Sequence, residues 1–521
     1  MRKAALMAAC VIGFLVTVTS CKKDKGDLTG VETRTTDSIS FDKSKMAGFY
    51  AKYPKFKVYQ SEIDELYKKY DYHYIWHDKK GTIEFAEVIY NRVNQIDKEG
   101  IEEDIPYKNE FNEMFASSGK PDLDSELLIS SMYFFYAKKV LNGIDPSKSK
   151  QTGWYLPRER TSYVAYLDSL MEDPKKLKED KSELFAQYYN LRKGLQKYRN
   201  IEKQGGWGTI TLEPGVKSLK QGDSSTTITQ VRKRLHMEGY LKNDSKSNVF
   251  DDELAKALEQ YDLRHNRVSD KLIGPNVVKD LNISVADRIR AISLNMERCR
   301  WVSPEMNTAR EFIAVNIPSY WLQYMRDGKE VLSSRVVVGK DMNKTVVFSG
   351  KMSYLAFSPY WNVPKSILEK EILPGIEKNS NYLDKHNMEW NGKSVRQKPG
   401  GQNALGKVKF MFPNTNNIYL HDTPAKSLFN KDDRAFSHGC VRVQKARELA
   451  IEIMKKDANW SVAKVDEYMN AGTEKSVPLK TKIPVYIAYF TAWADEDGSV
   501  SFYEDVYDRD GRLADMLYTS K

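Results

Sequence analysis

A chain of 521 residues, 41% of them hydrophobic, is too long for a single core, and we expect about three domains. Its 81 lysine and arginine residues exceed its 71 aspartate and glutamate residues by 10, and this modest excess is spread along the chain. Without a dense basic run, the charge pattern argues against nucleic acid as a partner.

The chain begins with a short apolar segment. Two basic residues precede a run from Ala4 to about Val18, which is too short to span a membrane and is typical of a secretory signal. Residues 18–21, Val-Thr-Ser-Cys, resemble a lipobox, whose cysteine is acylated and becomes the mature N-terminus. We therefore predict a lipoprotein signal over residues 1–20 and lipidation of Cys21; the alternative is an ordinary signal cut elsewhere. We expect a lipid-anchored protein of the cell envelope that faces the periplasm. Lys22 after the cysteine offers no obvious retention signal, which favours the outer membrane, but these residues leave the choice of membrane open.

The next two segments differ in pattern. Residues 21–40 are polar and lack periodicity, which predicts a flexible tether. Over residues 41–204 apolar residues recur at helical spacing, which predicts a helical scaffold domain. Residues 72–77 of this region hold His73 and His77 without a third ligand. We interpret both histidines as solvated and the aromatic residues beside them as core, and we predict no metal site.

Residues 205–290 start with a glycine-rich linker and continue as a small helical bundle. Two amphipathic patterns joined by glycine turns, followed by a short third helix, predict a three-helix module. The run resembles the peptidoglycan-binding three-helix module. It departs from that pattern at residues 264–270, Arg-His-Asn-Arg-Val-Ser-Asp, where a glycine-containing turn is usual. Glycan binding and a mere spacer role are both open.

From Glu311 the apolar period changes to two, which predicts a mostly β domain over residues 300–492. An insertion interrupts it at about residues 365–395, and its residues 365–388 are predicted to be helical and charged. Residues 493–521 are predicted to form a last strand, at residues 502–507, and a tail. The fold class is therefore multidomain α+β.

Apart from Cys10 and Cys21 near the start of the chain, the body contains two cysteines, Cys299 and Cys440. A reactive thiol in an oxidising envelope is at risk from a nearby partner, so we expect the two to lie far apart. Cys299 stands at the end of a predicted helix, and we interpret it as a packed structural residue rather than a redox residue.

The most informative stretch runs from His421 to Val443. A cysteine is nucleophilic as a thiolate, and a nearby imidazole can take its proton. The stretch supplies Cys440, with His438 two residues before it and His421 further upstream. Gly439 lets the backbone turn tightly beside the sulfur, and the amides of Gly439 and Cys440 are candidate oxyanion donors.

Residues 419–424, Tyr-Leu-His-Asp-Thr-Pro, and 434–443, Arg-Ala-Phe-Ser-His-Gly-Cys-Val-Arg-Val, closely resemble the signature of the L,D-transpeptidase catalytic domain (YkuD-type). The agreement continues through residues 359–364, 396–400 and 403–406. These runs resemble the large, scaffold-bearing branch found in Gram-negative envelopes (YcbB-like). In that branch an insertion at the position of residues 365–395 caps the active-site cleft.

The resemblance implies a role for each residue of the site. Cys440 is the nucleophile, and His421 is the proton carrier, oriented by a backbone carbonyl near Asp422. His438 has a supporting role and is the alternative base. Arg442 is expected to hold a substrate carboxylate or to tie the loop through backbone carbonyls. In the oxyanion loop the further candidates are Gly439 and Ser437, and Ser437 is either a donor or only a turn residue. Trp361 and Tyr360 either line the cleft or belong to the core. The candidates for substrate binding are Tyr419, Asn403, Trp361 and Tyr360.

The implied reaction is a two-step acyl transfer in cell-wall synthesis, with consequences for cell shape. Cys440 attacks the carbonyl of the third-position diamino acid of a peptidoglycan tetrapeptide stem, D-alanine leaves, and the side-chain amine of a second stem resolves the thioester. Donor and acceptor stems are the expected partners, together with cell-wall synthases, and no cofactor is expected. The resemblance also suggests that carbapenems acylate Cys440.

Two other classes of function are open. A hydrolase, either an L,D-carboxypeptidase or a peptidoglycan–lipoprotein hydrolase, would use the same Cys and His with water. A non-catalytic wall-binding lipoprotein would use only the lipid and the helical module, and the intact His421 and Cys440 argue against it.

Overall fold

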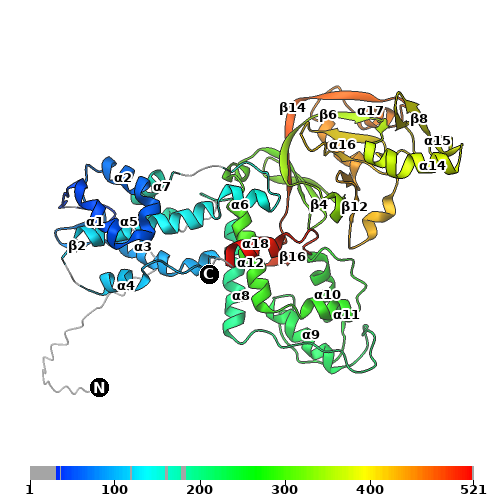
Figure 1. Cartoon of the computed structure of the whole chain (residues 1–521). Coiled ribbons are helices and arrows are strands. Elements are labelled where there is room, and N and C mark those ends of the chain that lie inside the picture. The colour runs from blue at the N-terminus through cyan, green and yellow to red at the C-terminus, as the bar shows by residue number, and fades with distance from the viewer. Residues whose placement is uncertain (1–30, 36, 118–119, 159–161, 178–182, 519–521) are drawn as a thin grey trace, which may run out of the picture.

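The computed structural model describes residues 31–35, 37–117, 120–158, 162–177 and 183–518. The predicted signal, the lipobox and Cys21 lie outside these residues. Within the described ranges, no helix has the length and apolar character needed to cross a bilayer. The architecture is multidomain α+β, as predicted, with a helical N-terminal lobe, a small helical module and a β domain (Figure 1).

The N-terminal lobe is built around α5 (Leu123–Ala137). Nearly every residue of α5 is buried, which is typical of a helix enclosed on all sides. The long helices α8 (Ala186–Lys203) and α12 (Val285–Cys299) pack against each other and link the lobe to the rest of the molecule (Figure 1). The remaining elements are α1 (Met46–Lys52), α2 (Gln60–Lys69), β1 (His77–Asp78), β2 (Gly81–Thr82), α3 (Glu84–Asn94), α4 (Lys108–Ala116), α6 (Pro146–Gln151) and α7 (Tyr163–Glu172).

The prediction that both histidines of residues 72–77 are solvated is wrong for His77. His77 is buried, and its Nδ1 lies 2.8 Å from Oε2 of Glu126 on α5. The buried Glu126 also accepts hydrogen bonds from the backbone N–H groups of Ile75, at 2.6 Å, and Trp76, at 3.2 Å. A carboxylate without solvent requires such partners. The aromatic residues Tyr74 and Trp76 are buried in the core, as predicted.

The small module has the three predicted helices: α9 (Thr226–Met237), α10 (Asp252–Arg264) and α11 (Pro275–Leu281), around a core of its own. Its unusual loop, residues 264–270, contacts the β domain. Asn266 accepts a hydrogen bond from Nη2 of Arg434 at 2.9 Å, and the backbone N–H of Val268 donates to Oδ1 of Asp432 at 2.7 Å. The departure from the usual turn therefore makes a domain contact.

The β domain contains a nine-stranded sheet that closes on itself. The strand order is β12-β5-β13-β11-β10-β6-β14-β3-β4, and an additional pairing of β4 with β5 joins the two ends, with β12 alongside β5. Alternate side chains fill the interior, as the period-two pattern predicts. Two helices, α16 (Ala446–Met454) and α17 (Val462–Met469), lie between β13 and β14 in the chain. The strands are β3 (Glu311–Asn316), β4 (Trp321–Arg326), β5 (Lys329–Gly339), β6 (Phe348–Phe357), β10 (Val408–Met411), β11 (Leu420–His421), β12 (Ala435–Ser437), β13 (Val441–Val443) and β14 (Lys475–Ala488).

The insertion is helical only in its first part. It begins with α13 (Lys365–Ile367), α14 (Leu373–Lys378) and α15 (Tyr382–Lys385), and it ends with the unpredicted hairpin β8 (Met388–Asn391) and β9 (Ser394–Gln397). The hairpin pairs with β7 (Trp361–Asn362), and the insertion has a small hydrophobic core of its own.

The predicted strand at residues 502–507 and tail are wrong. The chain forms a hairpin of β15 (Ala492–Ala494) and β16 (Val500–Phe502) and then the helix α18 (Arg509–Tyr518). Leu513 and Ala514 of α18 are buried, and Asp510 forms an ion pair with Arg298 of α12 at 2.6 Å. The end of the chain therefore packs against the helical part, which no local pattern indicated.

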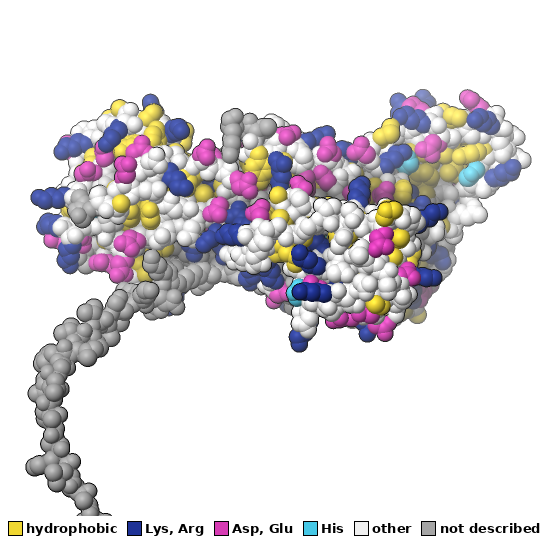
Figure 2. All heavy atoms as spheres, turned by 90° about the horizontal axis from the view of Figure 1, so that it is seen from below, with side chains coloured by type: hydrophobic (Ala, Val, Ile, Leu, Met, Phe, Trp, Pro, Cys, Tyr) yellow, Lys and Arg dark blue, Asp and Glu magenta, His cyan; other side chains and the backbone are white. Residues whose placement is uncertain are grey.

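Figure 2 shows basic and acidic side chains interspersed over one face of the molecule. This face has no continuous basic stripe, in agreement with the dispersed charge of the sequence.

Candidate active site

Three neighbouring strands place the candidate site. Lys409 of β10 lies opposite His421 of β11, and His421 lies opposite Arg442 of β13. Since residues directly opposite each other project from the same face of a sheet, these three residues share one face. Leu420 and Val441, one position away, are fully buried on the other face. The strand alternation therefore separates site from core.

Tyr419 and Cys440 extend this row, each just before its strand. The backbone N–H of Val441 donates to Tyr419 O at 3.1 Å, which aligns the two segments. The rings of Tyr419 and His421 lie 5.7 Å apart, in an edge-to-face arrangement. Cys440 is half-buried, and its Sγ lies 3.7 Å from Asn417 O. The structure therefore brings Cys440, His421, Tyr419 and Arg442 together.

The turn before Cys440 is held by Ser437. Its hydroxyl donates to Cys440 O at 2.5 Å and accepts from the Gly439 N–H at 3.1 Å. Gly439 has φ +115°, which only glycine adopts without strain. Thr345 donates to Gly439 O at 2.9 Å. Of the two alternatives for Ser437, these bonds support the turn role. The Gly439 amide is already used, which leaves the Cys440 amide as the candidate oxyanion donor.

His421 is buried and has a fixed orientation. Its Nδ1 lies 2.5 Å from the carbonyl oxygen of Asp422, the arrangement expected from the resemblance. A proton on Nδ1 leaves the lone pair of Nε2 free to accept another. Burial, reinforced by the positive charge of Arg442, lowers the pKa of His421 to about 3. The imidazole is therefore neutral near pH 7 and able to act as a base.

The Asp422 carboxylate has a structural task. One oxygen accepts from the Lys407 backbone N–H at 2.9 Å, and the other accepts from Nζ of Lys426 at 2.6 Å. These contacts fix the loop whose carbonyl orients His421. The residue therefore serves the site through its backbone.

The Cys440 thiol is subject to opposing influences. Burial raises its pKa, while the backbone N–H and hydroxyl group of Tyr419 and the charges of Lys409 and Arg442 lower it. Negative charge that develops on the sulfur therefore meets two hydrogen-bond donors and two cations. This environment supports nucleophilic chemistry.

Sequence reasoning missed Lys409. Its Nζ lies 4.0 Å from the centre of the Tyr419 ring, and burial lowers the pKa of its ammonium group. The strand alternation held a signal, because Lys409 stands between Val408 and Phe410, which are fully buried. What the sequence lacked was the pairing of this strand with the one that carries His421.

His438 points toward the insertion. Its side chain is exposed, and its Nε2 lies 3.5 Å from Oε1 of Glu371. His438 therefore has a partner in the insertion. Its supporting role in catalysis stays a prediction. The contact joins the insertion to the loop that carries Cys440.

Arg442 has a guanidinium group without a fixed partner. Its Nε is buried and makes no hydrogen bond to any residue that the structure describes, and burial lowers its pKa. No backbone carbonyl of the described chain ties it down. The resemblance implies that Arg442 either holds a substrate carboxylate or ties the loop through backbone carbonyls. A guanidinium group that no described residue ties down favours the first role.

The other three substrate-binding candidates lie at the base of the insertion. Asn403 is fully buried, and its amide donates to Pro359 O at 3.0 Å and Lys398 O at 2.9 Å. The prediction that Asn403 binds substrate is therefore corrected: its side chain joins the loop at Pro359 to the loop at Lys398. Trp361 packs on the core of the insertion, and the Tyr360 ring lies 4.1 Å from the Arg396 guanidinium carbon.

No group of three or more His, Cys, Asp or Glu side chains is placed to hold a metal ion in the described ranges of the chain. The chemistry available at the site is that of a thiol, an imidazole and two cations. The fold and the site thus define a β domain with a cysteine–histidine acyl-transfer centre.

Comparison with known families identifies the domains. The YkuD family, described as the L,D-transpeptidase catalytic domain, matches residues 310–483, and the family described as the Scaffold domain matches residues 61–195. The chain therefore carries an L,D-transpeptidase catalytic domain of the YkuD type and a scaffold domain. The two matches fall inside the predicted domains 300–492 and 41–204, whose exact limits stay predictions.

One curated relative is the "Putative L,D-transpeptidase" of Haemophilus influenzae. It is 36% identical over 248 residues, which cover 43% of this chain and 49% of that protein. The chain thus matches about half the length of this relative.

Among solved structures, an L,D-transpeptidase of Mycobacterium smegmatis is 12% identical, with 34% of this chain and 58% of that chain covered and a TM-score of 0.20. An L,D-transpeptidase of Xylanimonas cellulosilytica is 10% identical, with 53% and 100% covered and a TM-score of 0.17. Scores this low carry no argument about this chain.

Proposed function

We propose that this protein is an L,D-transpeptidase that links the third-position diamino acids of two peptidoglycan stem peptides. One observation carries the proposal: the buried, neutral His421, fixed through Nδ1 by the Asp422 carbonyl, shares a sheet face with Cys440. The matched YkuD domain supports the same chemistry.

In the first step, His421 takes the thiol proton while the Cys440 sulfur attacks the carbonyl of the third residue of the donor stem. The Cys440 amide donates to the oxyanion, and Arg442 holds a carboxylate of the stem. The C–S bond forms, the C–N bond to D-alanine breaks, and the proton on His421 passes to the departing amine.

In the second step, the side-chain amine of an acceptor stem attacks the thioester. His421 takes a proton from this amine, the C–N bond forms, and the C–S bond breaks with return of the proton to sulfur. Attack by water at this point would give hydrolysis instead. The contact between Glu371 of the insertion and His438 supports a cover over the cleft that disfavours water.

Mass analysis of a purified disaccharide-tetrapeptide incubated with the mature protein tests this reaction. The expected products are cross-linked dimers that have lost one D-alanine. Tripeptide without dimers would contradict the proposal and assign a carboxypeptidase.

The lipid anchor is also a proposal, supported by the Val-Thr-Ser-Cys run at residues 18–21. It would hold the enzyme at the envelope membrane, facing the periplasm, where cell-wall synthases are the expected partners. Cys21→Ser protein should leave the membrane fraction or persist as precursor. A processed Cys21→Ser form that still fractionates with membranes would refute the anchor.

A further inference from the structure

A pocket of about 330 Å³ lies where the helical lobe, the small module and the β domain meet. Its floor is the outer face of β14, β3 and β4, where Ala314 lies opposite both Gln323 and Tyr486. Leu156 and Leu263 line it from the lobe and the module. None of its lining residues belongs to the Cys440 site, so the pocket is a separate feature.

Several aromatic rings line the pocket. Trp321 and Trp493 are both half-buried, and neither indole N–H donates to a residue in the part of the chain that the structure describes. The lining thus combines flat apolar faces with two indole N–H groups that have no partner among the described residues. The aromatic side chains of the lining are Phe185, Trp321, Tyr486, Phe490, Trp493 and Tyr503.

The pocket has no uncompensated charge. Its charged lining residues are Arg264 and Asp495, and they form an ion pair with each other at 2.9 Å. A carboxylate or phosphate would find no free cation there. An acyl chain would leave the indole donors unpaired, which costs free energy when they are desolvated. The lining therefore selects a neutral ligand with both apolar faces and hydrogen-bond acceptors.

We propose that this pocket binds a neutral sugar ring of a glycan strand, such as an N-acetylated amino sugar. The C–H faces of a pyranose ring pack against aromatic rings, and its hydroxyl and acetamido oxygens accept from the indole groups. The volume is at the lower end of the range for small-molecule sites, which suits one ring with its substituents. The pocket would hold the glycan while a stem reaches Cys440, and this role rests on the proposed function. The class of ligand is argued from the lining of the pocket alone.

Calorimetric titration of the mature protein with tri-N-acetylchitotriose, which has no peptide and no charge, tests the site. We expect saturable binding. Ala314→Phe and, independently, Ala488→Leu fill the pocket from its floor and should each weaken binding by about tenfold or more. Acylation of Cys440 by a carbapenem checks that each variant is folded. The binding measured for a variant that passes this check tests the proposal.

Trp390→Ala provides the matched control, since Trp390 is an exposed tryptophan on β8 of the insertion. This variant should bind the trisaccharide like the unaltered protein. Absence of saturable binding, unchanged binding in a folded pocket variant, or a loss confined to Trp390→Ala would overturn the proposal. A protein that forms stem dimers but does not bind the trisaccharide would refute this inference alone and leave the proposed reaction intact.

Discussion

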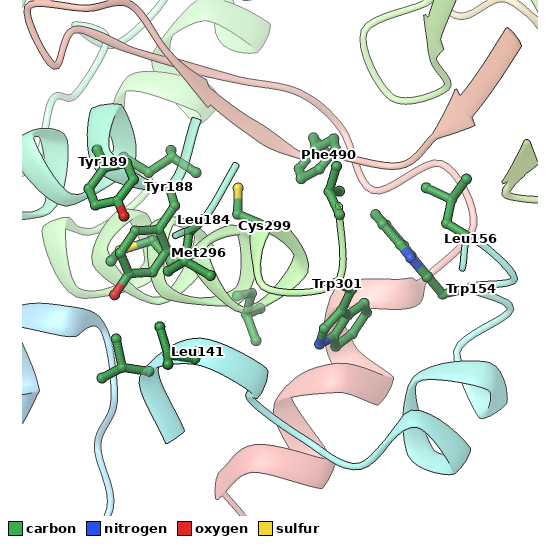
Figure 3. Close-up of a cluster of buried hydrophobic side chains, with 14 of the residues drawn as sticks. Leu141, Trp154, Leu156, Leu184, Tyr188, Tyr189, Met296, Cys299, Trp301 and Phe490 are labelled. Atoms are coloured by element: carbon green, nitrogen blue, oxygen red, sulfur yellow. The ribbon is translucent and has the colours of Figure 1, made fainter. Parts of the chain in front are cut away.

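The two cysteines of the described chain occupy opposite surroundings. Cys299 ends α12 inside a cluster of apolar and aromatic side chains that includes Tyr188, Met296 and Trp301 (Figure 3). It is fully buried, and this burial raises the pKa of its thiol well above the ordinary range. The nearby Arg298 and Arg300 oppose the shift only in part. Such a thiol is a small packing group.

Burial also raises the pKa of Cys440, but the groups around this thiol lower it. Tyr419 donates hydrogen bonds to the sulfur, Lys409 and Arg442 supply positive charge, and the thiol is only half-buried. The comparison teaches that access and compensating donors separate a nucleophile from a core residue. Each of the following predictions tests one part of that difference.

The largest effect is expected for Cys440 itself. The carboxylate of a carbapenem can pair with Arg442, and its strained carbonyl is a suitable electrophile for the sulfur. Intact-mass measurement after incubation should show one adduct, which survives Cys299→Ala and is abolished by Cys440→Ala. An adduct that persists without Cys440 would mean that the nucleophile is misassigned.

Removal of the base should have the next largest effect. His421→Ala should slow acylation by roughly two to four decades. Because the pKa of His421 is about 3, the imidazole stays neutral, and the acylation rate of the unaltered protein should be flat between about pH 5 and 8. In His421→Ala only the thiolate attacks, so the residual rate should rise about tenfold per pH unit. Stopped-flow acylation over this pH range provides the measurement.

His438→Ala is the control for the base. Its side chain faces Glu371, and the variant should keep more activity than His421→Ala and retain the flat pH profile. The reverse order of activities would move the base to His438 and make His421 a structural residue.

Lys409→Met should have a smaller effect, because it removes one of two cations near the sulfur. The pKa of Cys440 should rise, and acylation should slow by about tenfold at neutral pH. Lys407→Met is the matched control: this exposed lysine lies two residues earlier, and its Nζ donates to Asn470 at 2.6 Å. Equal rates in the two variants would show that Lys409 has no electrostatic role.

Much of the fold could be predicted from local patterns. Period-two alternation indicated the strands of the β domain, and helical spacing indicated the helical lobe and α9 to α11, because most of these elements bury one face; the enclosed α5 is an exception. Contacts between distant segments gave no such signal. His77 is held by Glu126, 49 residues away, and α18 pairs with α12 through Asp510 and Arg298.

The candidate site divides in the same way. Cys440 and His421 stand in a recognisable run, so they could be named from the sequence. Lys409 joins them only through the pairing of β10 with β11, and Asn403 could be seen as a loop tie only from its bonds to Pro359 and Lys398. Local spacing identifies the reacting groups, whereas their electrostatic and structural support depends on tertiary pairing.

The smallest effect on activity is expected at Cys299. Neither Cys299→Ala nor Cys299→Ser should change the acylation rate of Cys440, since Cys299 is buried among side chains of the helical part. The two should differ in stability. Alanine removes only a sulfur atom from the core, whereas serine buries a hydroxyl group among apolar and aromatic neighbours and should cost about 1–3 kcal/mol. Denaturant unfolding followed by circular dichroism should therefore order the proteins as unaltered, Ala, then Ser. A Ser variant as stable as the unaltered protein would show that the thiol has a polar partner, and its interpretation as a packing group would fail.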